Sequence, residues 1–64
     1  MVKVNGNLEE VGGMTLDAYL TATDYDISRI AVEKNGNIVP KSEYSNTILC
    51  DGDVIEVVSF VGGG

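Results

Sequence analysis

The sequence predicts an α+β roll, in which a mixed sheet of about four to five strands carries one helix on one face. Three observations support this prediction. Two Asn-Gly pairs, at residues 5–6 and 35–36, each join two short runs of β-type alternation, as in hairpins with a type I′ turn. A stretch with helical spacing lies between them, at residues 15–24, and the longest β-branched run comes last, at residues 54–61. Because the helix supplies a crossover, we expect the first and last strands to pair in parallel at the centre of the sheet.

The first hairpin alternates along residues 1–6, so Val2 and Val4 are expected to point into the core. Residues 7–11 return as the second strand, with Leu8 as the expected inward residue. Thr15 is the expected N-cap of the helix that follows. One apolar stripe on this helix is formed by Leu16, Tyr19 and Leu20. A helix of two to three turns is marginal alone, so packing on the sheet must stabilise it.

The second hairpin follows the same logic. Ile30 and Val32 alternate with outward residues, and residues 37–39 return after the turn. Pro40 ends the pairing because it has no N–H to donate. An irregular segment then leads to Asp51-Gly52, a tight turn into the last strand.

The last strand has two different faces. Glu56 is costly to bury without a partner, so we assign Ile55 and Val57 to the helix-covered core and Glu56 to the open face. This assignment places Val58 and Phe60 on the same open face. A cluster of exposed apolar side chains often marks a partner surface, so we interpret Val58, Phe60 and Glu56 as a partner-binding face. The alternative is that loops or neighbouring side chains cover Phe60.

Composition limits the classes of function. The chain of 64 residues is expected to form one domain, residues 1–61, followed by a flexible glycine tail, residues 62–64. Its net charge is −6 and its four basic residues are scattered, which argues against nucleic acid and against an anionic membrane surface. We expect neither a signal peptide nor a membrane span, because no long apolar run occurs. A single cysteine suits a reducing cytoplasm.

The sequence lacks the residue pairs that nucleophilic catalysis would need. The chain has no histidine, so a Ser-His or Cys-His nucleophile pair cannot form. Cys50 has no basic neighbour in sequence and is expected to be a small buried or half-buried filler. The acidic pairs at residues 24–26 and 51–53 fit turn chemistry better than a calcium loop, so no metal site is predicted. The sequence therefore favours a protein that is not itself an enzyme.

Two stretches carry a resemblance to a known family. "IAVEKNGNIVPKSEY", residues 30–44, and "DGDVIEVVSFVGGG", residues 51–64, resemble the ThiS family, the sulfur carriers of thiamine biosynthesis with a ubiquitin-like β-grasp fold. The most specific parts are the "NGxIVP" hairpin and the diglycine directly after the last strand. Lys41 stands where the family commonly has arginine. The small subunit of molybdopterin synthase also ends in Gly-Gly, but it lacks this hairpin and is usually longer.

The resemblance implies a mechanism. An E1-like adenylating partner of the ThiF type would use ATP and Mg to adenylate the carboxylate of Gly64, while the carrier itself binds no cofactor. A sulfur donor such as a cysteine desulfurase would then convert the adenylate to a thiocarboxylate for a thiazole synthase of the ThiG type. Gly62 and Gly63 would thread into the partner's active site, and the open face would dock on the partner.

Other functions remain compatible with the residues. The chain could carry sulfur for molybdopterin or for another transfer route. It could also be a ubiquitin-like protein modifier, or a plain interaction module in which the tail is expendable.

Overall fold

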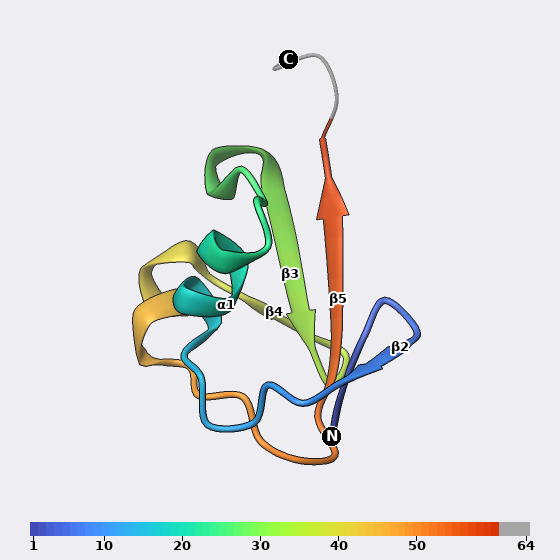
Figure 1. The fold of residues 1–64 in the computed structure, drawn as a ribbon. Helices are drawn as coiled ribbons and strands as arrows, with labels where there is room; N and C mark the ends of the chain where they lie inside the picture. The colour runs from blue at the N-terminus through green and yellow to red at the C-terminus, as the bar shows by residue number, and fades with distance from the viewer. Residues whose placement is uncertain (61–64) are drawn as a thin grey trace.

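The computed structural model describes residues 1–60, and it shows a five-stranded mixed sheet with one α-helix and two 3-10 helices (Figure 1). The strands and the α-helix are β1 (Val2–Val4), β2 (Asn7–Glu9), α1 (Leu16–Ala22), β3 (Ile30–Lys34), β4 (Asn37–Val39) and β5 (Val54–Ser59). The 3-10 helices are Ile27–Arg29 and Lys41–Asn46. The strand order is β2-β1-β5-β3-β4, with β1 and β5 parallel and the other pairs antiparallel. The predicted α+β roll, with its parallel first and last strands, is confirmed.

Both hairpin turns have the backbone that the Asn-Gly pairs predict. Asn5 and Gly6 have φ angles of 49° and 85°, and Asn35 and Gly36 have φ angles of 53° and 85°. A type I′ turn needs positive φ at both central residues, and Asn and Gly adopt this conformation at the lowest cost. These turns fix the register of both hairpins, which pair Val4 with Asn7 and Lys34 with Asn37.

The core lies between the sheet and α1 (Figure 1). The buried hydrophobic residues are Val2, Val4, Leu16, Tyr19, Leu20, Ile30, Val32, Tyr44, Leu49, Ile55 and Val57. This set contains all the inward residues expected for the first, third and last strands and the whole predicted helical stripe. None of the helices within residues 1–60 is long and apolar enough to cross a membrane.

The short helix α1 is stabilised at its first turn. The Thr15 hydroxyl accepts a hydrogen bond from the N–H of Ala18 at 3.4 Å, and Asp17 lies in the first turn, where the helix dipole favours an anion. The N–H of Leu16 donates to the carbonyl of Thr47 at 2.7 Å, which ties the helix start to the segment before β5. Packing and capping thus supply the stability that seven helical residues cannot generate alone.

The expected inward position of Leu8 is wrong. Leu8 pairs with Lys3 and is 67% exposed, because directly opposed residues of an antiparallel pair share one face. Glu9, opposite the buried Val2, takes the inward position instead, and its carboxylate accepts a hydrogen bond from the Tyr19 hydroxyl at 3.0 Å. Burial, together with the hydrogen bond to Glu9 and its charge, raises the pKa of Tyr19 to about 12. The polar partner on α1 therefore allows a carboxylate where the sequence pattern predicted an apolar residue.

Two leucine substitutions test this packing. We expect Leu20→Ala to lower the free energy of unfolding by about 2–5 kcal/mol, because the side chain is fully buried and its loss leaves a cavity. Leu8→Ala removes the same atoms from an exposed position and is expected to stay within about 0.5 kcal/mol of the parent. Urea unfolding of the three proteins measures both effects. A large loss for Leu8→Ala would contradict the register of β2.

Candidate functional site

The central strand β5 leads out of the sheet toward the C-terminal residues. In Figure 1 it runs beyond the β1–β2 hairpin, and Phe60 follows its last residue. The N–H of Phe60 donates to the carbonyl of Arg29 at 2.7 Å, so the chain is still attached to the start of β3 at this point. The predicted tail residues Gly62, Gly63 and Gly64 lie outside the described residues. The described part of the site is therefore the open face of the sheet and the end of β5.

The open face carries most of the exposed apolar side chains of the described residues. Val58 is 53% exposed and Phe60 is 56% exposed, and Glu56 is exposed beside them, as expected. The alternative, in which other groups cover Phe60, does not hold for residues 1–60. Three more exposed apolar residues belong to this face by register or by alternation along their strands: Leu8, Ile38 and Val54. We call these five apolar residues, with Glu33 and Glu56, the open-face patch.

Two glutamates lie directly opposite each other within the open-face patch. Glu33 on β3 pairs with Glu56 on β5, and both side chains are exposed. Like charges at directly opposed positions destabilise a sheet. Neither carboxylate has an ion pair with a basic group of residues 1–60. The pair is therefore a local electrostatic cost that a cationic group from outside the sheet would relieve.

The sequence reasoning did not include Glu33, Leu8, Ile38 or Val54 in the site. The register of the second hairpin could have revealed two of them, because a two-residue turn at residues 35–36 places Glu33 opposite Ile38. The pairing of Glu33 with Glu56 depends on the register between β3 and β5. Distant strands set that register, and no turn joins them.

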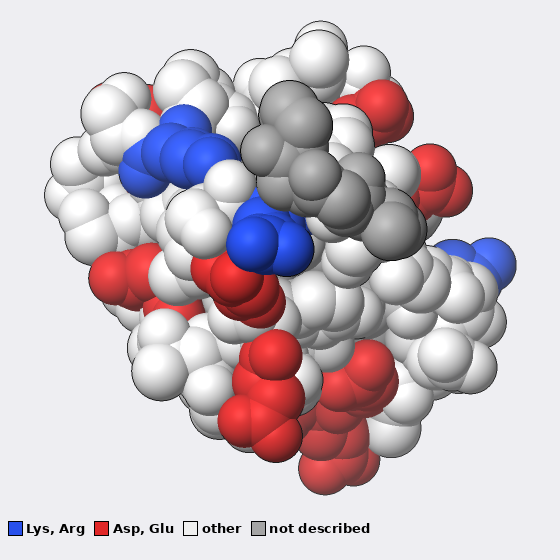
Figure 2. Space-filling model, turned by 90° about the horizontal axis from the view of Figure 1, so that it is seen from above, with Lys and Arg blue, Asp and Glu red and all other residues white. Residues whose placement is uncertain are grey.

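The end of the molecule where β5 finishes is mixed in charge. Figure 2 looks down on this end and shows basic side chains near the middle and at one edge, with acidic side chains on several sides and directly beside one of them. With a net charge of −6, the chain as a whole presents a negative field. Such a field favours a partner with a basic docking surface.

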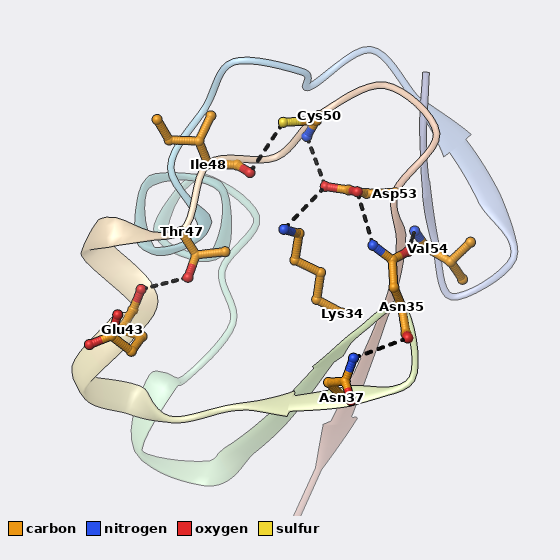
Figure 3. Close-up of polar contacts among 9 residues, drawn as sticks. All are labelled: Lys34, Asn35, Asn37, Glu43, Thr47, Ile48, Cys50, Asp53 and Val54. Atoms are coloured by element: carbon orange, nitrogen blue, oxygen red, sulfur yellow. Dashed lines mark hydrogen bonds and ion pairs between the residues drawn. The ribbon is translucent and has the colours of Figure 1, made fainter.

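A polar network holds the start of β5 (Figure 3). The carboxylate of Asp53 accepts hydrogen bonds from the Cys50 N–H at 2.9 Å and from the Asn35 side-chain amide at 3.1 Å, and the Lys34 ammonium lies 3.8 Å away. The Asn35 side chain in turn accepts from the N–H of Val54 at 2.8 Å. Burial raises the pKa of Asp53, but these hydrogen bonds and the Lys34 charge outweigh it, so the pKa lies below its usual 3.8. The turn before β5 and the turn before β4 are thereby joined through one carboxylate.

The expectation for Cys50 is wrong, because its side chain is exposed. Its neighbour Leu49 is fully buried, and the chain turns outward at the next residue to enter the Asp51-Gly52 turn. The Cys50 thiol lies 3.7 Å from the Ile48 carbonyl, its hydrogen-bond acceptor in Figure 3. The thiol contributes nothing to the core.

The acidic residues near the turns act as local caps. Asp26 accepts hydrogen bonds from the N–H and the hydroxyl of Ser28 at 3.0 and 2.6 Å, and Asp53 caps Cys50 as described above. Between Met1 and Phe60, no group of three or more His, Cys, Asp or Glu residues is arranged to hold a metal ion. Turn and cap chemistry accounts for these carboxylates.

The fold and the site together define a class. A five-stranded mixed sheet with one helix, whose central last strand leads to a glycine-rich C-terminal segment, is a ubiquitin-like β-grasp protein. The model of the ThiS family matches residues 2–64. The chain belongs to the ThiS family, the sulfur carriers of thiamine biosynthesis, which are not catalytic proteins themselves. The resemblance found in the sequence is confirmed.

Individual relatives agree with this assignment. The chain is 42% identical over 50 residues to the sulfur carrier protein ThiS of Bacillus subtilis, covering 78% of this chain and 76% of that protein. It is 47% identical over 51 residues to a thiazole synthase of Paramagnetospirillum magneticum, covering 80% of this chain but only 16% of that much longer protein. The crystal structure of the thiamine biosynthesis protein ThiS from Geobacter metallireducens superposes with a TM-score of 0.77 at 27% identity, covering 98% of this chain and 97% of that one.

The Asp53 network predicts a pH dependence of stability. Because the folded-state pKa of Asp53 is lowered, the unfolded chain binds this proton first as the pH falls. The stabilisation from Asp53 is therefore present above its ordinary value of 3.8 and is lost as the pH falls through the folded-state pKa. We expect Asp53→Asn to be less stable than the parent at neutral pH and the difference to shrink below the ordinary value.

Urea unfolding of both proteins between neutral pH and about pH 3 measures this difference. All other carboxylates are shared, so the comparison isolates Asp53. A constant difference across the series would show that the network does not hold this carboxylate in its ionised form.

Proposed function

We propose that the carboxylate of Gly64 is the group on which this carrier receives sulfur. An oxygen of this carboxylate attacks the α-phosphate of ATP on an E1-like partner of the ThiF type, and pyrophosphate leaves. A persulfide on a donor such as a cysteine desulfurase then attacks the carbonyl carbon, and AMP leaves as an acyl disulfide forms. A thiol reductant cleaves the S–S bond of this acyl disulfide, forms a new disulfide with the donor's sulfur, and leaves a thiocarboxylate on Gly64. The observation that carries this proposal is the family match, which extends to Gly64.

The tail needs little chemistry of its own. An α-carboxyl group has a pKa of about 3.3–3.7, so it is already a nucleophilic anion at neutral pH. Gly62, Gly63 and Gly64 have no Cβ, so a narrow channel in the partner can admit the backbone where side chains would collide. We take residues 1–61 as the folded carrier domain and residues 62–64 as the tail. The carrier binds no cofactor, and ATP and Mg belong to the adenylating partner.

The open-face patch is the proposed docking surface. Its five exposed apolar side chains provide apolar surface, and burying that surface against a partner is favourable. Of these residues, Val58 and Phe60 lie closest in sequence to the tail. Glu33 and Glu56 provide the polar part, and a basic side chain of the partner would relieve their mutual repulsion. A modest interface of this kind suits a carrier that must leave one partner for the next.

A thiazole synthase of the ThiG type is the proposed acceptor of the sulfur. The thiazole synthase of Paramagnetospirillum magneticum contains a stretch similar to this chain, so carrier-like and synthase parts occur together in that protein. Their occurrence in one protein supports the proposal that this carrier binds a separate ThiG-type synthase. We place the reaction in the cytoplasm, where ATP is abundant and where a reducing environment protects the exposed thiol of Cys50.

Mass spectrometry tests the role of Gly64. Incubation of the carrier with a ThiF-type enzyme, ATP and a sulfur donor should raise its mass by the difference between sulfur and oxygen, and fragmentation should place the change on Gly64. A variant that lacks Gly64, which keeps the described fold intact, serves as the matched control and should show no change. An unchanged mass for the parent would overturn the proposal, and isopeptide conjugates on lysines would point to a protein modifier instead.

A charge reversal tests the docking surface separately from the fold. Glu56→Lys places opposite charges across β3 and β5, so stability should rise by about 0.2–1 kcal/mol. The same change should raise the KM of the ThiF-type enzyme for the carrier roughly tenfold or more, because like charges across an interface cost several kcal/mol. Glu43→Lys, in the 3-10 helix Lys41–Asn46, reverses an exposed charge away from the patch and should leave KM within about twofold. Equal KM values for both variants would show that the open-face patch is not the docking surface.

A further inference from the structure

The side chain of Asn5 binds the backbone of β5 in two places. Its amide oxygen accepts from the N–H of Val57 at 2.8 Å, and its amide nitrogen donates to the carbonyl of Val57 at 3.2 Å. Strand β1 ends at Val4, so no backbone of β1 reaches Val57. The Asn5 side chain therefore takes the place that the next residue of a longer β1 would occupy.

Asn5 makes the last attachment of β5 on its β1 side. The peptide groups of alternate β5 residues face β1: the Asp53 and Ile55 carbonyls accept from Lys3 and Asn5 at 2.9 and 3.0 Å. Val57 is next in this alternation and is bound by the Asn5 side chain. Beyond Val57, the described chain is attached on the β3 side: Val58 and Ser59 lie opposite Ala31 and Ile30, and the N–H of Phe60 donates to the Arg29 carbonyl.

We infer that Asn5 is a positioning residue for sulfur transfer, which fixes the direction in which β5 leaves the sheet. Val58 follows Val57 directly and Phe60 lies just past the end of β5, so the Asn5 contacts orient the part of the open-face patch nearest the tail in sequence. The inference rests on the proposed function, because the value of this orientation is that it presents Gly64 and the patch to the adenylating partner together. A small misplacement of a reacting group, caused by a change far from the chemistry, can slow a reaction by as much as ~10²-fold.

The second Asn-Gly turn provides a matched control. Asn35 has nearly the same backbone conformation as Asn5, with φ angles of 53° and 49°, and its side chain also accepts from a β5 N–H. That N–H belongs to Val54, at the opposite end of β5 from the tail. Asn→Gly at either position removes the side-chain amide and keeps a backbone that glycine adopts readily. The two variants differ in which end of β5 they release.

The experiment compares Asn5→Gly, Asn5→Asp and Asn35→Gly with the parent. The readouts are kcat and KM of a ThiF-type enzyme with the carrier as varied substrate, amide hydrogen exchange, and urea unfolding. Asn5→Gly should lower kcat/KM about tenfold, mainly through KM, within the range that misplacement can cause. It should also speed exchange at Val57, whose N–H loses its acceptor. Asn35→Gly should stay within about twofold in kcat/KM even where its stability loss is equal or larger.

Asn5→Asp keeps the acceptor for the Val57 N–H but cannot donate to the Val57 carbonyl. It should therefore recover part of the lost kcat/KM. Equal kcat/KM for Asn5→Gly and Asn35→Gly, or unchanged exchange at Val57, would overturn the positioning role. If the parent itself formed no thiocarboxylate, the proposed function would fail, and the exchange data would still decide whether Asn5 holds β5.

Discussion

The parallel contact between β1 and β5 is the constraint on which this domain depends. Its register pairs Lys3 with Val54 and Val4 with Ile55, so it joins residues about fifty positions apart in a very short ladder. Among the strands of residues 1–60, β5 alone links the two hairpins, because β1 and β3 lie on either side of it and do not pair with each other. Without this contact, the β1–β2 hairpin would be an isolated two-stranded unit, which is marginally stable in water, while β5 would remain paired with β3 alone. The Asn5 side chain and the Asp53 network strengthen the two ends of this junction.

One strand serves both the core and the surface. Ile55 and Val57 are buried against the helix layer, while Glu56 and Val58 face outward between them. The side-chain period of a strand is two residues, so a slip by one position would bury Glu56 and expose Ile55. The cost of burying that charge thus protects the register of the whole sheet. Glu56 therefore has two roles. Its charge disfavours the shifted register, and its carboxylate lies opposite Glu33 in the proposed docking surface.

Local rules predicted much of this structure, and non-local pairing explains what they missed. The Asn-Gly turns, the Thr15 cap and the faces of β5 follow from short stretches of sequence, and all are confirmed. The predictions for Leu8 and Cys50 are wrong because the register of β2 and the approach to the Asp51-Gly52 turn, rather than the residue type, set the exposure of these side chains. The opposition of Glu33 and Glu56 needs the register of two distant strands. The proposed role of the glycine tail rests on the family resemblance, since glycine has no side chain from which a chemical role could be predicted.

The central position of the last strand has a consequence for how the protein is made. During synthesis the chain emerges from its N-terminus, so β1 and β3 are complete while the strand that belongs between them does not yet exist. The sheet cannot close until residues 54–59 have left the ribosome, and closure then joins parts of the chain that are far apart, which is slow. A nascent or truncated chain that lacks β5 therefore has no complete open face to offer a partner. The order of synthesis therefore makes the complete open face, which is the proposed docking surface, the last part of the sheet to form.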